Sequence, residues 1–183
     1  ASPTLTQCVF SGNTATVYGG GLCNKQGAQP TLQSCRFTGN TAEFAGGGMA
    51  CHGASAPATS GTVFKANMAD SFGGAVYNFQ SSPAFVNCVF DGNAANTGGG
   101  GMANYDAAEP TVMNCTFANN IGLSQGGGIA CLDGSDATVT NSIVWANTGY
   151  SIYCSGSMPT VTYSCIEDGY SGEGNQDSDP LFI

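Results

Sequence analysis

A lysine, a histidine and two aromatic residues recur at matching positions of this chain. Lys25, His52, Phe79 and Tyr105 are spaced 27, 27 and 26 residues apart. In a chain that repeats with this period, they share one outward-facing column. A cation beside aromatic rings is typical of ordinary surface and also of a carbohydrate-binding platform. The column is therefore a candidate glycan site, with plain surface as the alternative.

Carboxylates are the second set of groups that could do chemistry. Two paired carboxylates can hydrolyse a glycosidic bond, whereas a lyase needs a base beside a cation or a metal. The acids lie mostly in turns or loops and form no clear column, and Arg36 and Lys65 belong to different columns. We therefore expect a protein that is not an enzyme. A polysaccharide-binding or polysaccharide-cleaving β-helix is the alternative.

The charge balance limits the partners. Twelve acidic residues face three basic ones, and the net charge of −9 disfavours nucleic acid. There is no run of 18 apolar residues, so no membrane span is predicted. Near the C-terminus, Asp177 and Asp179, with Glu173 and Asn175 nearby, could offer oxygens to calcium, but their spacing fits neither an EF-hand nor a nonapeptide repeat. We expect no cofactor, and calcium is the alternative.

Nine cysteines indicate an oxidising compartment, because no C-x-x-C pair is present to favour a metal. Most of them fall at two positions of the repeat. Stacked neighbours would lie about 4.8 Å apart, which a disulfide accepts. A ladder of small, buried free thiols is the equal alternative. The bridges that this stacking predicts are Cys8 to Cys35, Cys88 to Cys115 and Cys131 to Cys154.

A repeated phrase, F-x-x-N or a close variant, positions all these residues. Its asparagines are Asn13, Asn40, Asn67, Asn93, Asn120 and Asn147. A unit of about 27 residues cannot bury its own apolar face, so successive units must stack with their strands in parallel. The sequence therefore predicts an all-β parallel β-helix of about six to seven coils over residues 1–165. Residues 166–183 leave the repeat and form an acidic tail, a possible cap or junction segment.

Within each coil, the phenylalanine of the phrase should point inward and the asparagine should form a corner. Asparagine tolerates left-handed backbone angles, and its amide can bond the next amide along the stack. We therefore interpret the asparagines as a structural ladder rather than as catalytic groups. Glycine triplets such as Gly19-Gly-Gly21 suit a sharp corner or a close backbone approach.

The paired motif F-x-x-N and G-G-A-apolar, seen outright in Gly73-Gly-Ala-Val76, resembles the repeats of chlamydial polymorphic outer membrane proteins and related bacterial surface β-helix proteins. The tail Gly172–Phe182 is similar to the closing segment of β-helix repeat proteins secreted by environmental bacteria. The resemblance implies a right-handed β-helix at a cell surface or in an extracellular matrix, with structural or adhesive work and no catalytic residue.

The first coil begins a standard repeat at Pro3-Thr-Leu5 without a cap. Because open strand edges need covering, we expect either a segment of a larger surface protein or copies that stack head-to-tail into a filament. Ice binding is a weaker alternative, since the threonine column is interrupted by Ala58 and Ala84.

Overall fold

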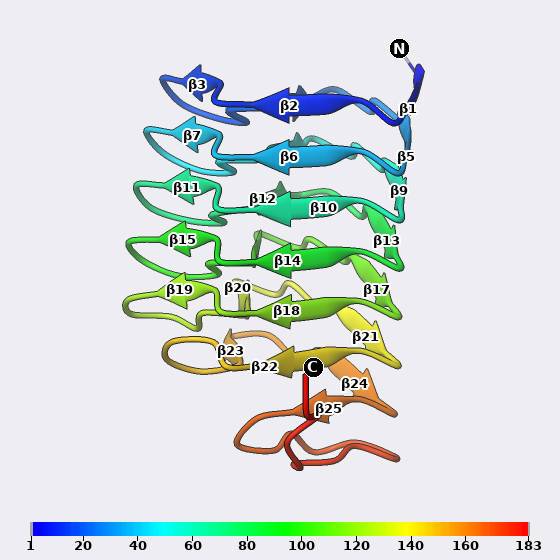
Figure 1. The fold of residues 1–183 in the computed structure, drawn as a ribbon, viewed down its shortest axis with the longest axis vertical. Coiled ribbons are helices and arrows are strands. Elements are labelled where there is room, and N and C mark those ends of the chain that lie inside the picture. Colours follow the sequence, from blue (N-terminus) through cyan, green and yellow to red (C-terminus); the bar gives the residue numbers. More distant parts are fainter. Residues whose placement is uncertain (1, 183) are drawn as a thin grey trace.

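The computed structural model describes residues 2–182, and within this range it contains strands, turns and loops. Twenty-five short strands form four parallel sheets that wind repeatedly around one core (Figure 1). Each strand pairs with the equivalent strand of the next coil. The predicted all-β parallel solenoid, with coils of about 27 residues, is confirmed.

We name the sheets A to D in the order in which the chain enters them. Sheet A contains β1 (Thr4–Thr6), β5 (Thr31–Gln33), β9 (Ala58–Ser60), β13 (Ala84–Val86), β17 (Thr111–Met113), β21 (Thr138–Thr140) and β24 (Thr160–Thr162). Sheet B contains β2 (Val9–Ser11), β6 (Arg36–Thr38), β10 (Val63–Lys65), β14 (Val89–Asp91), β18 (Thr116–Ala118), β22 (Ile143–Trp145) and β25 (Cys165–Ile166). Sheet C contains β3 (Thr14–Ala15), β7 (Thr41–Ala42), β11 (Met68–Ala69), β15 (Ala94–Ala95) and β19 (Ile121–Gly122). Sheet D contains β4 (Leu22–Asn24), β8 (Met49–His52), β12 (Val76–Phe79), β16 (Met102–Tyr105), β20 (Ile129–Leu132) and β23 (Ile152–Ser155).

The strand register aligns equal positions of the repeat, so that sequence columns become physical ladders. Phe64 pairs with Phe37 on one side and with Phe90 on the other. The phenylalanine rings stack along the core with centroids 4.1 to 4.9 Å apart. From the second coil to the fifth they are fully buried, and each contributes about 2 kcal/mol by leaving water. The predicted inward phenylalanine ladder is present.

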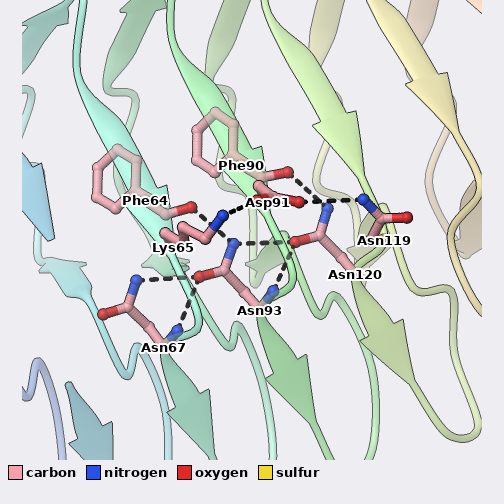
Figure 2. Close-up of polar contacts among 8 residues, drawn as sticks. All are labelled: Phe64, Lys65, Asn67, Phe90, Asp91, Asn93, Asn119 and Asn120. Atoms are coloured by element: carbon pink, nitrogen blue, oxygen red, sulfur yellow. Dashed lines mark hydrogen bonds and ion pairs between the residues drawn. The ribbon is translucent and has the colours of Figure 1, made fainter. Parts of the chain in front are cut away.

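The asparagines form a continuous ladder of buried amides. Asn93 shows the pattern (Figure 2): its backbone N–H and its Nδ2 both donate to Oδ1 of Asn120, at 3.0 and 2.9 Å. Its Nδ2 also donates to the carbonyl of Phe64 at 3.0 Å, and its Oδ1 accepts from the N–H and the Nδ2 of Asn67. Each side chain thereby satisfies buried backbone groups at the corner of two neighbouring coils.

One detail of the predicted corner is wrong. The ladder asparagines do not adopt left-handed angles; the residue before each of them does, with φ between 52° and 64°. The backbone N–H of each asparagine can then donate to the next asparagine along the stack. The position that favours glycine is therefore the residue before the asparagine. These left-handed residues are Gly12, Gly39, Ala66, Gly92, Asn119 and Ala146.

The three predicted disulfides are not formed, and all nine cysteines, each within residues 2–182, are free. In the first column, the thiol is directed to backbone carbonyls: Sγ of Cys115 donates to Met113 O at 3.2 Å and accepts the N–H of Cys88 at 3.4 Å. Thr62 and Ser142 make the same bonds with their hydroxyls. The column therefore requires a small side chain with a hydrogen-bonding γ atom, which explains its mixture of Cys, Thr and Ser.

In the second cysteine column, the sulfurs also have other partners. Sγ of Cys131 accepts from Asn104 Nδ2 at 3.5 Å, and Sγ of Cys154 lies 3.5 Å from the hydroxyl of Tyr170. The alternative of a ladder of buried thiols is the arrangement in the structure, instead of bridges from Cys8 to Cys35, Cys88 to Cys115 and Cys131 to Cys154.

The segment after β25 continues the hydrogen bonding of the stack (Figure 1, red). Asn175 accepts the N–H of Ser164 on Oδ1, at 3.0 Å, and donates from Nδ2 to the carbonyls of Val161 and Tyr170. Tyr170 packs against the core. Asn175 thus takes the place that a γ oxygen or sulfur of a further coil would occupy.

The amide ladder predicts a large loss of stability in the variant Asn93→Ala. The substitution removes the partners of buried groups on both neighbouring coils, and we expect the free energy of unfolding to fall by on the order of 3 kcal/mol in urea denaturation. The matched control is Asn96→Ala, an exposed asparagine in the same coil with no side-chain hydrogen bond in the structure. Equal losses in the two variants would contradict a role specific to the ladder.

Free thiols predict the outcome of a simple titration. Protein unfolded without reductant should react with nine equivalents of a thiol reagent, because all nine cysteines are reduced. A count of three, with six more cysteines reacting only after reductant is added, would show that the three predicted disulfides form.

Candidate functional site

A glycine triplet separates sheet C from sheet D in most coils and forces a sharp corner. Gly46 has φ of +70°, in the left-handed region that favours glycine. A Cβ on Gly47 would collide with the backbone carbonyls of Met68 and Gly74 in the next coil. Because no side chain fits inside this corner, the backbones approach closely. Outward side chains on its two sides can then converge.

This convergence produces a small cleft on the outer surface, which we call the aromatic cleft. Its volume is about 260 Å³. Three of its lining residues precede the glycine corner of their coil and four follow it, and in the third coil this corner reads Gly73-Gly-Ala75. The residues that line it are Tyr18, Phe44, His52, Phe72, Tyr77, Phe79 and Tyr105. The cleft spans the first four coils.

Tyr77 forms the floor of the aromatic cleft, with only 4% of its surface exposed. The ring of Tyr18 lies almost parallel to it, with the centroids 6.1 Å apart and the planes 5° apart. Phe79 and Tyr105 form another near-parallel pair at 6.1 Å, and Phe44 meets Tyr18 edge-on at 5.5 Å. The cleft therefore presents several flat apolar faces in fixed orientations.

Small residues between the aromatic ones leave the space that the cleft occupies. In its column of sheet D, Tyr77 pairs with Ala50 on one side and Ala103 on the other. On the opposite wall, Ala45 separates Tyr18 from Phe72. A column of aromatic residues alone would fill the corner, whereas alternation with alanine leaves it hollow.

His52 contributes an uncharged imidazole to the wall. Its ring lies 4.3 Å from the ring of Tyr18, and its buried Nε2 has no hydrogen-bond partner. Burial lowers the pKa of His52 below its ordinary value of 6.5, and the positive charge of Lys25 lowers it further. At neutral pH, His52 therefore acts as an aromatic, uncharged group.

Charged groups border the aromatic cleft at its two ends along the stack. Lys25 Nζ lies 5.6 Å from the centroid of the Tyr18 ring, within cation–π range. At the other end, the nearby carboxylate of Asp133 raises the pKa of Tyr105 above its ordinary value. Asp106, directly after Tyr105, accepts a 2.7 Å hydrogen bond from Gln80.

The prediction that the acids form no clear column is wrong for two pairs. Tyr105 pairs with Leu132, which makes Asp106 and Asp133 neighbours on consecutive coils. Glu43 and Asp70 are neighbours in the same way, directly after β7 and β11. The sequence did contain this signal, since the members of each pair are 27 residues apart.

The structure brings the predicted patch together. His52, Phe79 and Tyr105 occupy one column and line the aromatic cleft, and Lys25 continues the column at its rim. The sequence interpretation missed the four residues that complete the cleft, because they belong to other columns and meet only at the glycine corner. These are Tyr18, Phe44, Phe72 and Tyr77.

The other predicted charged groups do not join the cleft. Lys65 forms an exposed 2.7 Å ion pair with Asp91, which also accepts a hydrogen bond from Asn119 (Figure 2). The hydrogen bond from Lys65, and then that from Asn119, lower the pKa of Asp91. Exposed pairs of this kind contribute little to stability.

No metal centre was found in residues 2–182, where no three His, Cys, Asp or Glu side chains are grouped to hold an ion. In the tail, Oδ1 of Asn175 accepts the backbone N–H of Ser164 at 3.0 Å. Nor does this part of the chain contain a helix long and apolar enough to cross a membrane.

The fold and its glycine corners agree with the comparison with known families. The chain belongs to the family described as "Right handed beta helix region", whose profile matches residues 1–105 and 87–176. The predicted right-handed β-helix is thereby confirmed. No curated protein and no solved structure matches the chain.

His52, the only histidine, predicts a measurable pH effect. Its imidazole should titrate below 6.5 in an NMR pH series, and Lys25→Gln should raise its pKa towards that value by removing one of the two causes. The unfolded chain binds this proton more tightly than the folded one. The contribution of His52 to stability should therefore be fully present above pH 6.5 and be lost as the pH drops from 6.5 through the lowered pKa. A pKa at or above 6.5 would show that His52 is solvated.

Proposed function

We propose that this protein is an adhesive β-helix that works outside the cell and binds glycans at the aromatic cleft. The cleft itself is the observation that carries the proposal. Aromatic rings with fixed orientation offer flat apolar faces to the C–H faces of sugars, and the tyrosine hydroxyls offer polar edges.

The scaffold supports an adhesive role. The wall of the cleft in sheet D comes from strands that are hydrogen-bonded on both sides, so little ordering cost remains to be met there on binding. The cleft lies on the side of the solenoid, so several copies of it could be displayed along one fibre. If copies stack head-to-tail, or if the chain is a segment of a longer surface protein, the cleft would recur along a fibre.

A polysaccharide-cleaving enzyme is the second candidate, and one observation favours it. Asp106 and Asp133 lie on consecutive coils beside Tyr105, which lines the cleft. Two neighbouring carboxylates beside a sugar site are the equipment of a glycoside hydrolase. Cleavage of a bound chain would therefore depend on these two residues.

The repeat supplies substitutions that test glycan binding without disturbing the fold. Tyr77→Ala and Phe72→Ala place alanine where neighbouring coils already have Ala50, Ala103 and Ala45. In affinity electrophoresis through gels containing a panel of neutral, cationic and anionic polysaccharides, we expect the wild type to be retarded by at least one. The double variant should lose about tenfold in affinity, as is usual when aromatic anchors are removed.

The matched control is Tyr163→Asn, which removes an exposed tyrosine outside the cleft and places asparagine where the preceding coil has Asn141. It should bind like the wild type. Equal retardation of the double variant and the wild type, or none with any polysaccharide, would refute the proposal. Shortening of a bound polysaccharide by the wild type but not by Asp133→Asn would establish the enzyme instead.

A further inference from the structure

The rings of the aromatic cleft are surrounded mainly by negative charge. Asp106 follows Tyr105 directly and lies close enough to Tyr77 that its charge helps to raise the pKa of that buried tyrosine. Asp133 follows Leu132, the strand partner of Tyr105 on the next coil, and its carboxylate raises the pKa of Tyr105. Lys25 is the one basic residue at the rim of the cleft within residues 2–182.

The opposite wall carries a second pair of carboxylates. Glu43 immediately precedes Phe44, and Asp70 lies two residues before Phe72. Both carboxylates are exposed. Four carboxylates therefore border the residues that line the cleft, in a chain whose net charge is already −9. This surface repels uronates, sulfated sugars and other anions, and it concentrates cations.

The cleft also has the ring faces that bind cations. An ammonium group above an aromatic face is attracted by the ring quadrupole, and the attraction grows as water is excluded. The molecule already uses this interaction once, because Lys25 Nζ lies over the ring of Tyr18. The rings of Phe79 and Tyr105 are stacked at 6.1 Å beside Asp106, and no cation from residues 2–182 lies over either of them.

We propose that the ligand of the aromatic cleft is a glycan containing amino sugars with free, protonated amines. The inference rests on the proposed glycan-binding function and specifies the ligand's charge. The sugar rings pack on the partly exposed rings of Phe79 and Tyr105, above the floor that Tyr77 forms. The ammonium groups lie between these faces and the carboxylates of Asp106 and Asp133, which supply charge complementarity.

Isothermal titration of the full chain with two matched oligosaccharides tests this assignment. The probes are a glucosamine tetramer and an N-acetylglucosamine tetramer, which share a backbone and differ in charge. We expect the glucosamine tetramer to bind about tenfold more tightly, as the upper range of a cation–π contact allows. The double variant Asp106→Asn, Asp133→Asn should remove most of this preference.

Two controls separate the cleft from the overall charge of the protein. Asp168→Asn removes a carboxylate at an exposed turn with a left-handed φ of 67°, which asparagine tolerates, and should leave the preference unchanged. Tyr77→Ala keeps every charge and should weaken the binding of both tetramers. If Tyr77→Ala binds the glucosamine tetramer like the wild type, net charge alone explains the attraction and the inference fails.

The charge assignment and the glycan function can fail separately. Equal affinity for the two tetramers, or tighter binding of the acetylated one, overturns the cationic ligand and leaves glycan binding in place. Binding of neither tetramer also overturns it, and retardation by another polysaccharide in the gel panel then decides whether the proposed function survives.

Discussion

The hydrogen bond from each ladder asparagine to the next determines how the whole chain stacks. A buried amide of this kind is satisfied only when the next coil places the same residue at the same height, as Asn67 and Asn93 do. A slip of one residue would leave buried polar groups without partners and turn the core outward. The step from Asn67 to Asn93 is 26 residues instead of 27, and it shows how strictly the asparagines must align. The third coil is a residue shorter in the loop after Phe79, and its ladder bonds keep the same 3.0 Å length.

Everything that depends on this register could be predicted from the sequence. Period and parity sufficed to place the phenylalanine ladder inside, to align His52 with Phe79 and Tyr105, and to indicate a parallel β-helix. The disulfides could not be predicted, because column spacing gives the distance between cysteines but not the direction of their thiols. In the structure, the thiols point towards backbone carbonyls, as Cys115 does towards Met113 O. The hydroxyl of Ser142 fills the same position on the next coil. The left-handed corner was predicted one residue late, since the amide geometry that decides it is not visible in a sequence.

The aromatic cleft could be predicted only in part, for a geometric reason. Column analysis compares a residue with its counterparts on other coils, and it identified the wall that lies in one column. The opposite wall reaches the cleft because the glycine triplet turns the chain within a coil, and this turn relates different columns. Gly47, whose position cannot accept a Cβ, is therefore as necessary to the cleft as the rings that line it. The same corner is missing from the sixth coil, which has four residues between Asn147 and Ile152 and no strand in sheet C.

The strongest argument for function is that the fold does not require these aromatic residues. Alanine or glycine occupies the positions of Tyr77 and Phe72 on neighbouring coils, and the stack continues through them with the same pairing. In the fifth coil the same surface carries Gln125, Ala130 and Leu132, and the strand pairing is again intact. The interior ladders repeat because each coil must bury the same apolar face. The rings of the cleft pack as a small hydrophobic cluster around buried Tyr77, but they are confined to four coils and the other coils stack without them. The repeat therefore does not demand them, and we interpret the cluster as a binding surface.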